Sequence, residues 1–445
     1  MNALSFKRYE ISGVLRLCLL IGTAMVAQTA NGRVIEVSTV KDLYAAVNDS
    51  ANRGVTVHLA PGKYLLTTTY GRENVLRRNR GALRLQPGMS LMGSEKRVDT
   101  NGDGVPDPVS VETPDDFSVP GTETIIDGSA LDLPFLERRD CAGEKFNAPN
   151  PVIHIGVDNL ISHLTVFAGD HVAIGEPTND PVDPNGNLSM EVTSSVVEGD
   201  LGLSMTFVNS ECAAQSARSV LTFSHNVVRG SGVLIANFLT GDATNDHPGG
   251  PAIWATVTSN LFYNTRLALR AIGGAKGTDD GSVTLYMSGN VFRNNGSNFV
   301  GSGATSGWPT PAVGNRLSVR SDSDTLGEAL SNVSLTAGAG ELDDPRRSEI
   351  DAEFIRSRFI RASPDTPPEI SIVGGGGRNN HVVVSIRRAS VKTSAGVPIQ
   401  GGLLIQDEPV LDSGTNTARL AGSRRDFIRF NQGLPAPATH FFLEH

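Results

Sequence analysis

Aromatic residues, cysteines and long apolar runs are all scarce in this sequence. Aromatic residues make up 6% of the 445 positions, whereas glycine occurs 48 times and asparagine is frequent. Such a composition suits stacked coils joined by many tight turns better than it suits a helical bundle. We therefore expect an all-β protein.

The first 30 residues differ in composition from the rest. Lys7, Arg8 and Arg16 precede an apolar run, Leu17–Ala27, which small residues follow. This order is typical of a secretory signal peptide, which we predict at residues 1–30. The alternative is a membrane anchor, but the run has 11 residues and a spanning helix needs about 20. We expect export to the periplasm or the extracellular medium, with no membrane span after cleavage.

Basic residues are outnumbered by acidic ones. The formal charge is −9, and loss of residues 1–30 removes three basic residues and one acidic residue, which makes the charge −11. An acidic protein has no electrostatic reason to bind nucleic acid or anionic lipid. Neither is an expected partner.

The cysteines allow one disulfide bond at most after export. One of the three lies inside the predicted signal peptide, which leaves Cys141 and Cys212. Export exposes them to oxidising conditions, so they form either one disulfide across a long loop or two buried thiols. Both alternatives stay open, because the sequence does not give the separation of their Cα atoms.

A short pattern of one polar and two apolar residues recurs through the middle of the chain. Successive copies begin 36, 31, 34 and 30 residues apart, a range in which self-similarity indicates a solenoid. The five copies, which we call anchors, are Asn159-Leu160-Ile161, Ser195-Val196-Val197, Asn226-Val227-Val228, Asn260-Leu261-Phe262 and Asn290-Val291-Phe292. We expect the asparagines to adopt the left-handed backbone of a sharp turn, with their amides stacked along the axis.

Segments with strand-like alternation flank the anchors. Residues 219–224 and 282–287 alternate apolar and polar side chains, so one face of each is expected to be buried. A second alternation begins seven and nine residues after two of the anchors, at Val233 and Ile235 and at Leu267 and Leu269. We expect these core positions to lie in register, so that each repeat forms one coil of a β-solenoid.

The order of segments near the N-terminus resembles the right-handed parallel β-helix proteins of the pectin lyase-like group. Residues 38–47 predict a short amphipathic helix behind a Ser/Thr cap, and β-type segments follow at 55–64, 83–94 and 124–128. The resemblance implies a helix that caps the open edge of the first coil. It covers roughly residues 33–300.

We therefore predict the fold to be an all-β, right-handed parallel β-helix with a short N-terminal capping helix. Residues 31–320 are expected to form the β-helix, and residues 321–445 are expected to add C-terminal coils or an irregular cap.

An acidic segment early in the chain has the spacing of a calcium-binding loop. Oxygen-bearing side chains alternate along it, a glycine stands at its sixth position, and a further acid follows at its ninth. The predicted Ca²⁺ ligands are Asp99, Asn101, Asp103, Val105 (through its carbonyl oxygen) and Asp107. The alternative is a solvated acidic turn between two early coils.

Polar residues stand three positions after the start of most anchors. Because the two intervening residues are apolar, we expect these side chains to point outward, about 4.8 Å from one coil to the next. They are Glu198, Arg229, Tyr263 and Arg293, which we call the stripe. A saccharide chain could lie along the stripe; the alternative is an ordinary solvated wall.

The family resemblance implies enzymes that act on acidic polysaccharides, which directs attention to candidate catalytic groups. Elimination from a uronate needs a cation that neutralises the carboxylate, for which the candidates are Arg266 and Arg270. It also needs a base, for which the candidates are Asp246 or His247. Asp246 and His247 lie in a long loop, residues 241–250, whose residue types are also those that favour ordinary turns. The Trp-Ile-Asp-His segment of pectate lyases and the Gly-His-Gly element of polygalacturonases are absent.

Two functional hypotheses follow. In the first, a secreted monomer binds an acidic polysaccharide and cleaves it as a lyase or a glycoside hydrolase. In the second, the same outer wall serves adhesion or structure without catalysis. The sequence does not choose between them, because it indicates the fold more clearly than it indicates a catalytic site.

Overall fold

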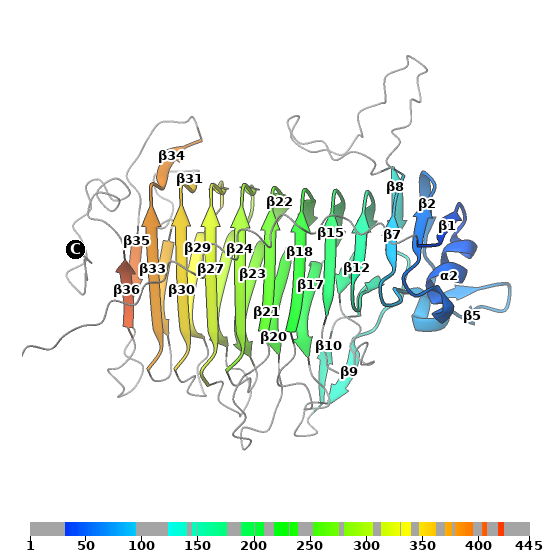
Figure 1. Ribbon diagram of the computed structural model, residues 1–445, viewed down its shortest axis with the longest axis horizontal. Helices are drawn as coiled ribbons and strands as arrows, with labels where there is room; N and C mark the ends of the chain where they lie inside the picture. Colours follow the sequence, from blue (N-terminus) through cyan, green and yellow to red (C-terminus); the bar gives the residue numbers. More distant parts are fainter. Residues whose placement is uncertain are drawn as a thin grey trace, which may run out of the picture.

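Three long parallel sheets dominate the computed structural model (Figure 1). It describes residues 32–94, 123–139, 145–148, 150–175, 188–199, 201–208, 218–230, 232–238, 252–275, 280–305, 313–329, 331–339, 347–361, 370–375, 379–394, 403–406 and 417–421. Within them the chain visits sheet 1, sheet 2 and sheet 3 in turn and then returns to sheet 1 one coil further on. The predicted parallel β-helix is thus confirmed.

The strands of sheet 1 pair in the order β1 (Val34–Val37), β2 (Thr56–Leu59), β7 (Ser90–Met92), β12 (Asn159–Ser162), β15 (Ser189–Thr193), β18 (Arg218–Ser224), β21 (Ala252–Thr258), β24 (Ser282–Ser288), β27 (Arg316–Asp322), β30 (Glu349–Ile355), β33 (His381–Arg387) and β36 (Thr417–Ala421). Those of sheet 2 are β3 (Gly62–Leu65), β8 (Thr124–Asp127), β13 (Thr165–Phe167), β16 (Val196–Gly199), β19 (Val227–Gly230), β22 (Leu261–Thr265), β25 (Val291–Arg293), β28 (Thr325–Gly327), β31 (Arg358–Arg361) and β34 (Ser390–Thr393).

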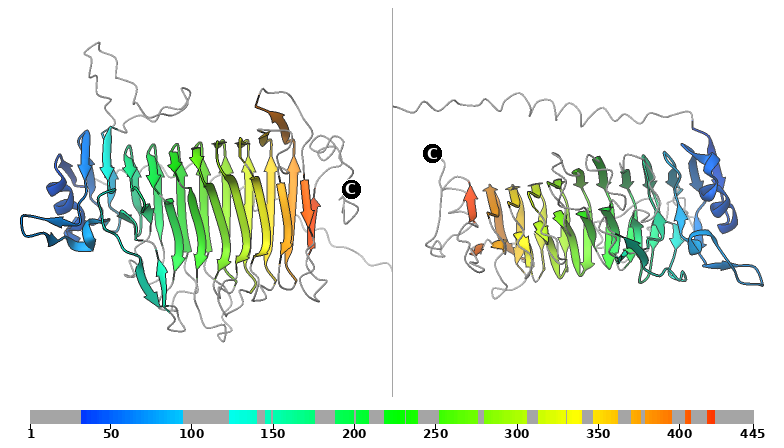
Figure 2. Two further views of the ribbon diagram at one scale, coloured as in Figure 1. Left: turned by 180° about the vertical axis from the view of Figure 1, so that it is seen from behind. Right: turned by 90° about the horizontal axis from the view of Figure 1, so that it is seen from below.

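Sheet 3 consists of β6 (Leu83–Arg84), β11 (Ile153–His154), β14 (Val172–Gly175), β17 (Leu201–Val208), β20 (Val233–Phe238), β23 (Leu267–Ala275), β26 (Ser297–Thr305), β29 (Ser331–Ala339), β32 (Ile370–Gly375) and β35 (Leu403–Gln406). Two antiparallel pairs, β4 (Thr69–Tyr70) with β5 (Val75–Leu76) and β9 (Leu136–Arg139) with β10 (Lys145–Ala148), stand apart from the three sheets (Figure 2). Short 3₁₀ turns occur at η1 (Ser50–Asn52) and η2 (Arg78–Gly81).

The predicted capping helix is present as α2 (Val40–Asn48) at the β1 end of the molecule (Figure 1). The side chain of Thr39 accepts a hydrogen bond from the backbone N–H of Asp42, which caps the first turn. Leu43 and Val47 are fully buried, so the apolar face of the helix packs on the first coil. The helix thereby shields the apolar interior of that coil from solvent.

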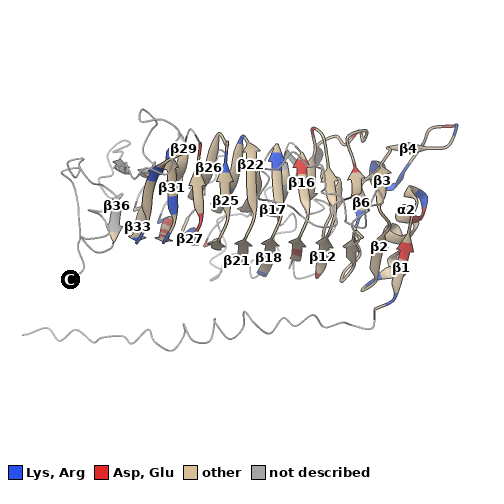
Figure 3. Cartoon of the chain, turned by 90° about the horizontal axis from the view of Figure 1, so that it is seen from above, with Lys and Arg blue, Asp and Glu red and all other residues tan. Residues whose placement is uncertain are grey.

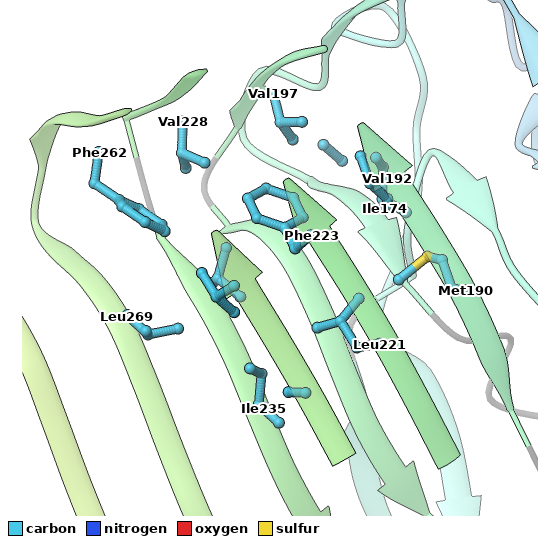
Figure 4. Close-up of a cluster of buried hydrophobic side chains, with 14 of the residues drawn as sticks. Ile174, Met190, Val192, Val197, Leu221, Phe223, Val228, Ile235, Phe262 and Leu269 are labelled. Atoms are coloured by element: carbon cyan, nitrogen blue, oxygen red, sulfur yellow. The ribbon is translucent and has the colours of Figure 1, made fainter. Parts of the chain in front are cut away.

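The interior repeats the same apolar contacts from coil to coil. Phe223, Phe262 and Phe292 are fully buried, and the rings of Phe262 and Phe292 stack with their centroids 4.6 Å apart. Figure 4 shows aliphatic side chains of all three sheets, among them Leu221, Val228 and Ile235, gathered with the rings of Phe223 and Phe262 in the interior. Each coil thus buries its apolar face on the next one, as a solenoid requires.

A ladder of buried polar side chains runs along the bend between sheets 1 and 2. The Nδ2 of Asn226 donates to Oδ1 of Asn260 at 3.2 Å, and the Nδ2 of Asn260 donates to Oδ1 of Asn290 at 2.9 Å. Each acceptor oxygen also receives the backbone N–H of the residue before it in the ladder, at 2.9 and 3.0 Å. The predicted stacking of the asparagine amides is confirmed.

The left-handed backbone lies one residue before the anchors, so our assignment of it to the asparagines was wrong. His225 and Ser259 have φ values of 57° and 56°. The anchor asparagine instead directs its side chain toward the neighbouring coil, where it forms the hydrogen bonds of the ladder. At the next bend, asparagines do adopt the left-handed backbone, since Asn264 and Asn294 have φ values of 56° and 54°.

Two register assignments from the sequence are also corrected. Asn159 is paired with Met190 in sheet 1, and the residue at the ladder position of its coil is Leu164 instead. In sheet 3, Val233 pairs with Leu269 rather than with Leu267. One residue of this two-residue shift comes from an irregularity between Arg229 and Gly230, where the next coil holds the extra residue Asn264, and the other arises between Gly230 and Val233.

The strands beyond residue 321 continue the same three sheets as far as β36. The expected division at 320/321 falls inside β27, whose residues pair on both sides. The C-terminal segments that the structure describes are therefore coils of the β-helix.

Candidate functional site

The four residues of the stripe stand in register on sheet 2. Glu198 on β16 pairs with Arg229 on β19, Arg229 pairs with Tyr263 on β22, and Tyr263 pairs with Arg293 on β25. Phe262 and Phe292, next to the last two in sequence, point into the core, so the stripe side chains lie on the outer face. The predicted geometry of the stripe is confirmed, and its role in binding remains a prediction.

The stripe is partly neutralised within itself. The guanidinium of Arg229 lies 2.9 Å from a carboxylate oxygen of Glu198, and their side chains are 23% and 33% exposed. Beside the stripe runs a row of fully buried apolar residues, Val196, Val227 and Leu261, against which Tyr263 packs. The stripe is therefore half-buried rather than a freely solvated set of charges. In Figure 3 the charged positions of this wall stand out as blue and red segments on the tan strands.

The stripe extends toward the N-terminus through residues that the sequence did not reveal. Phe167 on β13 pairs with Glu198, and Asp127 on β8 pairs with Phe167. Asp127 lies 2.6 Å from the ammonium of Lys63. The segment Leu164-Thr165-Val166 is the equivalent part of its coil, but it departs from the anchor pattern, since Leu164 replaces the polar residue and Thr165 replaces the first apolar one.

The two candidate carboxylate partners lie in different surroundings. Arg266 is exposed at the bend between sheets 2 and 3, where its backbone N–H donates to the carbonyl of Gly230 at 3.2 Å. Arg270 is half-buried on β23, with Leu234 and Val300 as its neighbours in the adjacent coils. Four residues separate the two arginines, so their Cα atoms lie at most about 13 Å apart.

The Arg270 guanidinium is incompletely satisfied. Burial lowers the pKa of Arg270, although the group stays protonated at any physiological pH. Its Nε is buried and has no hydrogen-bond partner in the described part of the chain. Ala236 and Ile272, both fully buried, form an apolar cluster with Leu234 on the same face of the sheet. A cation in such surroundings attracts a carboxylate strongly, because solvent screens the pair poorly.

His154 is a poor candidate for proton transfer near neutral pH. It lies on β11 and is 7% exposed, with its Nε2 3.0 Å from Oδ1 of Asn150. Burial lowers the pKa of His154 to about 4, so the imidazole is neutral at pH 7. Its role is structural.

The remaining predicted site residues lie outside the described residues. They are Asp246 and His247 of the long loop, the calcium ligands Asp99, Asn101, Asp103, Val105 and Asp107, and the cysteines Cys141 and Cys212. The proposed meeting of Asp246 or His247 with the arginines therefore stays a prediction.

The described residues contain no cluster of three or more His, Cys, Asp or Glu side chains suited to a metal ion. In the same part of the chain, no helix has both the length and the apolar character that a membrane crossing requires.

The chain is thus a parallel β-helix protein whose outer wall carries a polar stripe and a half-buried arginine. Comparison with known proteins finds no matching family model and no matching curated sequence.

Three solved structures resemble this chain at low sequence identity. The mannuronan C-5 epimerase AlgE4 A-module of Azotobacter vinelandii has a TM-score of 0.34 at 13% identity, over 86% of this chain and 94% of that chain. The endo-xylogalacturonan hydrolase of Aspergillus tubingensis has a TM-score of 0.31 at 12% identity, over 86% and 98%. PfbA, a surface adhesin of Streptococcus pneumoniae, has a TM-score of 0.24 at 11% identity, over 88% and 91%. TM-scores this low do not assign an activity to this chain.

Proposed function

We propose that this protein is exported and binds an acidic polysaccharide along its outer wall. The observation that carries the proposal is Arg270, a half-buried cation whose Nε lacks a hydrogen-bond partner among the described residues. A uronate carboxylate would bind the accessible part of the guanidinium and neutralise its charge. Arg266 and the stripe would make further, more solvated contacts with the chain.

The arrangement of the arginines supports binding over elimination as the primary activity. Arg266 lies at an exposed bend and Arg270 is half-buried within the strand, so separate uronate units of one chain could reach each of them. Elimination would need a base close to neutrality beside Arg270, for which Asp246 and His247 are the candidates. Cleavage of the polysaccharide is therefore the second proposed function, and the same experiment tests it.

The test uses the full chain without residues 1–30 and two acidic polysaccharides, polygalacturonate and alginate. We expect Arg270→Ala to weaken binding in titration calorimetry about tenfold or more, because a charge-assisted hydrogen bond is lost. Stability should be retained or raised, because the substitution removes a half-buried cation that lacks a full set of partners. Arg316→Ala is the matched control, since Arg316 is an exposed arginine on sheet 1.

Equal binding by wild-type protein and Arg270→Ala would refute the proposal. A rise in absorbance at about 235 nm, from new unsaturated uronate ends, would add lyase activity to binding. Release of reducing ends without that signal would indicate hydrolysis instead. Repeating each assay with EDTA tests the calcium loop at residues 99–107, which we propose holds that part of the chain in place.

A further inference from the structure

The outer face of sheet 1 carries a group of exposed side chains that the proposed function does not use. Three neighbouring strands, β18, β21 and β24, contribute two residues each. We call this group the platform; its members are Val220, Thr222, Trp254, Thr256, Thr284 and Tyr286. Val220, Trp254 and Tyr286 are 42%, 43% and 38% exposed. Large apolar side chains that gather at a surface mark an interaction site.

The platform is a regular grid. Val220, Trp254 and Thr284 pair across the strands as one row, and Thr222, Thr256 and Tyr286 form the next row. Trp254 and Tyr286 therefore lie on a diagonal, with their Cα atoms about 8 Å apart. The pairing of these strands shows no register shift, whereas sheets 2 and 3 each contain one. The two aromatic rings stand on a straight, flat part of the wall.

The chemistry of the platform is that of an uncharged sugar. None of its six residues carries a charge, and three of them offer a threonine hydroxyl. Charged neighbours lie at its borders: Glu191 pairs with Thr222, Arg320 pairs with Tyr286, and the guanidinium of Arg218, two residues before Val220 on β18, lies 5.9 Å from the centre of the Trp254 ring. A pyranose ring has apolar C–H faces that stack on aromatic rings and hydroxyl edges that hydrogen-bond to groups such as threonine. An acidic sugar would find one cation, Arg218, beside the Trp254 ring and none among the six residues of the grid.

The small area of the apolar part of the platform favours a narrow, extended ligand over a folded protein. Three strands by two residues of one face cover roughly 150 Å² of wall, whereas a stable protein interface buries about 800 Å² on each partner. An extended oligosaccharide needs only a narrow track. We propose that the platform binds an uncharged oligosaccharide segment, at a site separate from the one that we assign to acidic chains on sheets 2 and 3.

The two tryptophans of the chain, Trp254 and Trp308, make a direct test possible. In Trp308→Phe, Trp254 is the sole tryptophan, and its emission reports on the platform. We expect saturable quenching or a blue shift on titration with a neutral hexasaccharide, either cellohexaose or mannohexaose. In the otherwise wild-type protein, Trp254→Ala and Tyr286→Ala should each weaken calorimetric binding about tenfold. Tyr286→Phe, which keeps the ring, should stay within about threefold of wild type.

Two results would overturn the proposal. One is the absence of calorimetric binding of both neutral hexasaccharides by the wild-type protein up to about 5 mM. The other is self-association in sedimentation velocity that Trp254→Ala abolishes, since a second copy of the chain would then be the occupant. Failure here differs from failure of the proposed function, because Arg270→Ala affects only acidic chains and Trp254→Ala affects only neutral ones.

Discussion

In the middle coils the buried ladder consists of amides, and at its C-terminal end the same position holds a carboxyl group. Asn290 donates from its backbone N–H and its Nδ2 to Oδ1 of Asp324, at 2.7 and 2.9 Å. Asn260 receives the same two hydrogen bonds from Asn226 in the coil before. An amide and a carboxyl group thus fill one geometry, but only the carboxyl group can change its charge.

Asp322, two residues from Asp324, shows that position rather than residue type decides how a carboxyl group titrates. Hydrogen bonds from Arg356 lower the pKa of Asp322 on the outer face. Burial raises the pKa of Asp324 to about 6, although Ser321 and Asn290 donate hydrogen bonds to it. The end of the ladder is therefore the part whose stability depends on pH.

The largest expected effect comes from breaking the ladder at its centre. Asn260→Ala removes the acceptor of the Asn226 backbone N–H and two donations from Nδ2, to Phe223 and Asn290. Buried groups would be left unpaired, so we expect a loss of about 3 kcal/mol in the free energy of unfolding. Denaturant unfolding of wild-type and variant protein measures it. A loss below about 1 kcal/mol would mean that water replaces the amide.

The next effect is a pH dependence that Asp324→Asn should remove. The folded pKa of Asp324 is about 6 and lies above the unfolded value, so the folded state holds the proton more tightly. The stabilisation of the folded state by this tighter proton binding is fully present below about pH 4 and is lost as the pH rises through 6. At pH 7.5 the asparagine variant should be more stable than wild type by about 2 kcal/mol, and at pH 4 the two should be nearly equal.

The hydrogen bonds allow this exchange. In Asp324→Asn, Oδ1 still accepts from Asn290, and Nδ2 can donate to the hydroxyl of Ser321, which can turn toward Ser357 at 3.0 Å. Asn260→Asp supplies the converse comparison, because it puts a carboxyl group in the middle of the ladder and should create a second such pH dependence. An Asp324→Asn variant that loses the same stability at both pH values would show that the acid has a structural role beyond its charge.

The smallest effect is expected on the outer face of the same bend. Arg356→Gln removes the ion pair with Asp322, but Arg356 is exposed, so the unfolding midpoint at physiological salt should not change measurably. The pKa of Asp322 should rise toward its ordinary value, which a carboxyl NMR titration detects. A clear drop in the unfolding midpoint would mean that this surface ion pair, and not only the ladder, stabilises the fold.

The features that the sequence predicted correctly are those nearest the ladder. Asn226, Asn260 and Asn290 recur because each must meet the next coil, and the stripe follows them before any irregularity intervenes. The register failed in sheet 3, because two extra residues in the following coil, Asn264 and one between Thr265 and Leu269, leave no mark in the apolar pattern. Asn159 failed for a different reason, since the anchor pattern also fits an ordinary strand of sheet 1.

The candidate site was predictable only where strand alternation fixes it. Trp254 alternates with the buried Ile253 and Ala255, so an aromatic residue at an outward position was a signal in the sequence that we did not use. The burial of Arg270 was beyond prediction, because it depends on residues of neighbouring coils that are far away in sequence.

Because each ladder amide contacts only the coils next to it, one coil is the unit in which this protein can grow or shrink. The 30 residues from Asn260 to the residue before Asn290 make one complete turn of the chain. Loss of such a segment would bring Asn226 next to Asn290 and leave both ends of the molecule unaltered. Duplication would lengthen the wall by about 4.8 Å. Because coils can be lost or added one at a time, the length of wall available to an extended ligand can change without a new fold.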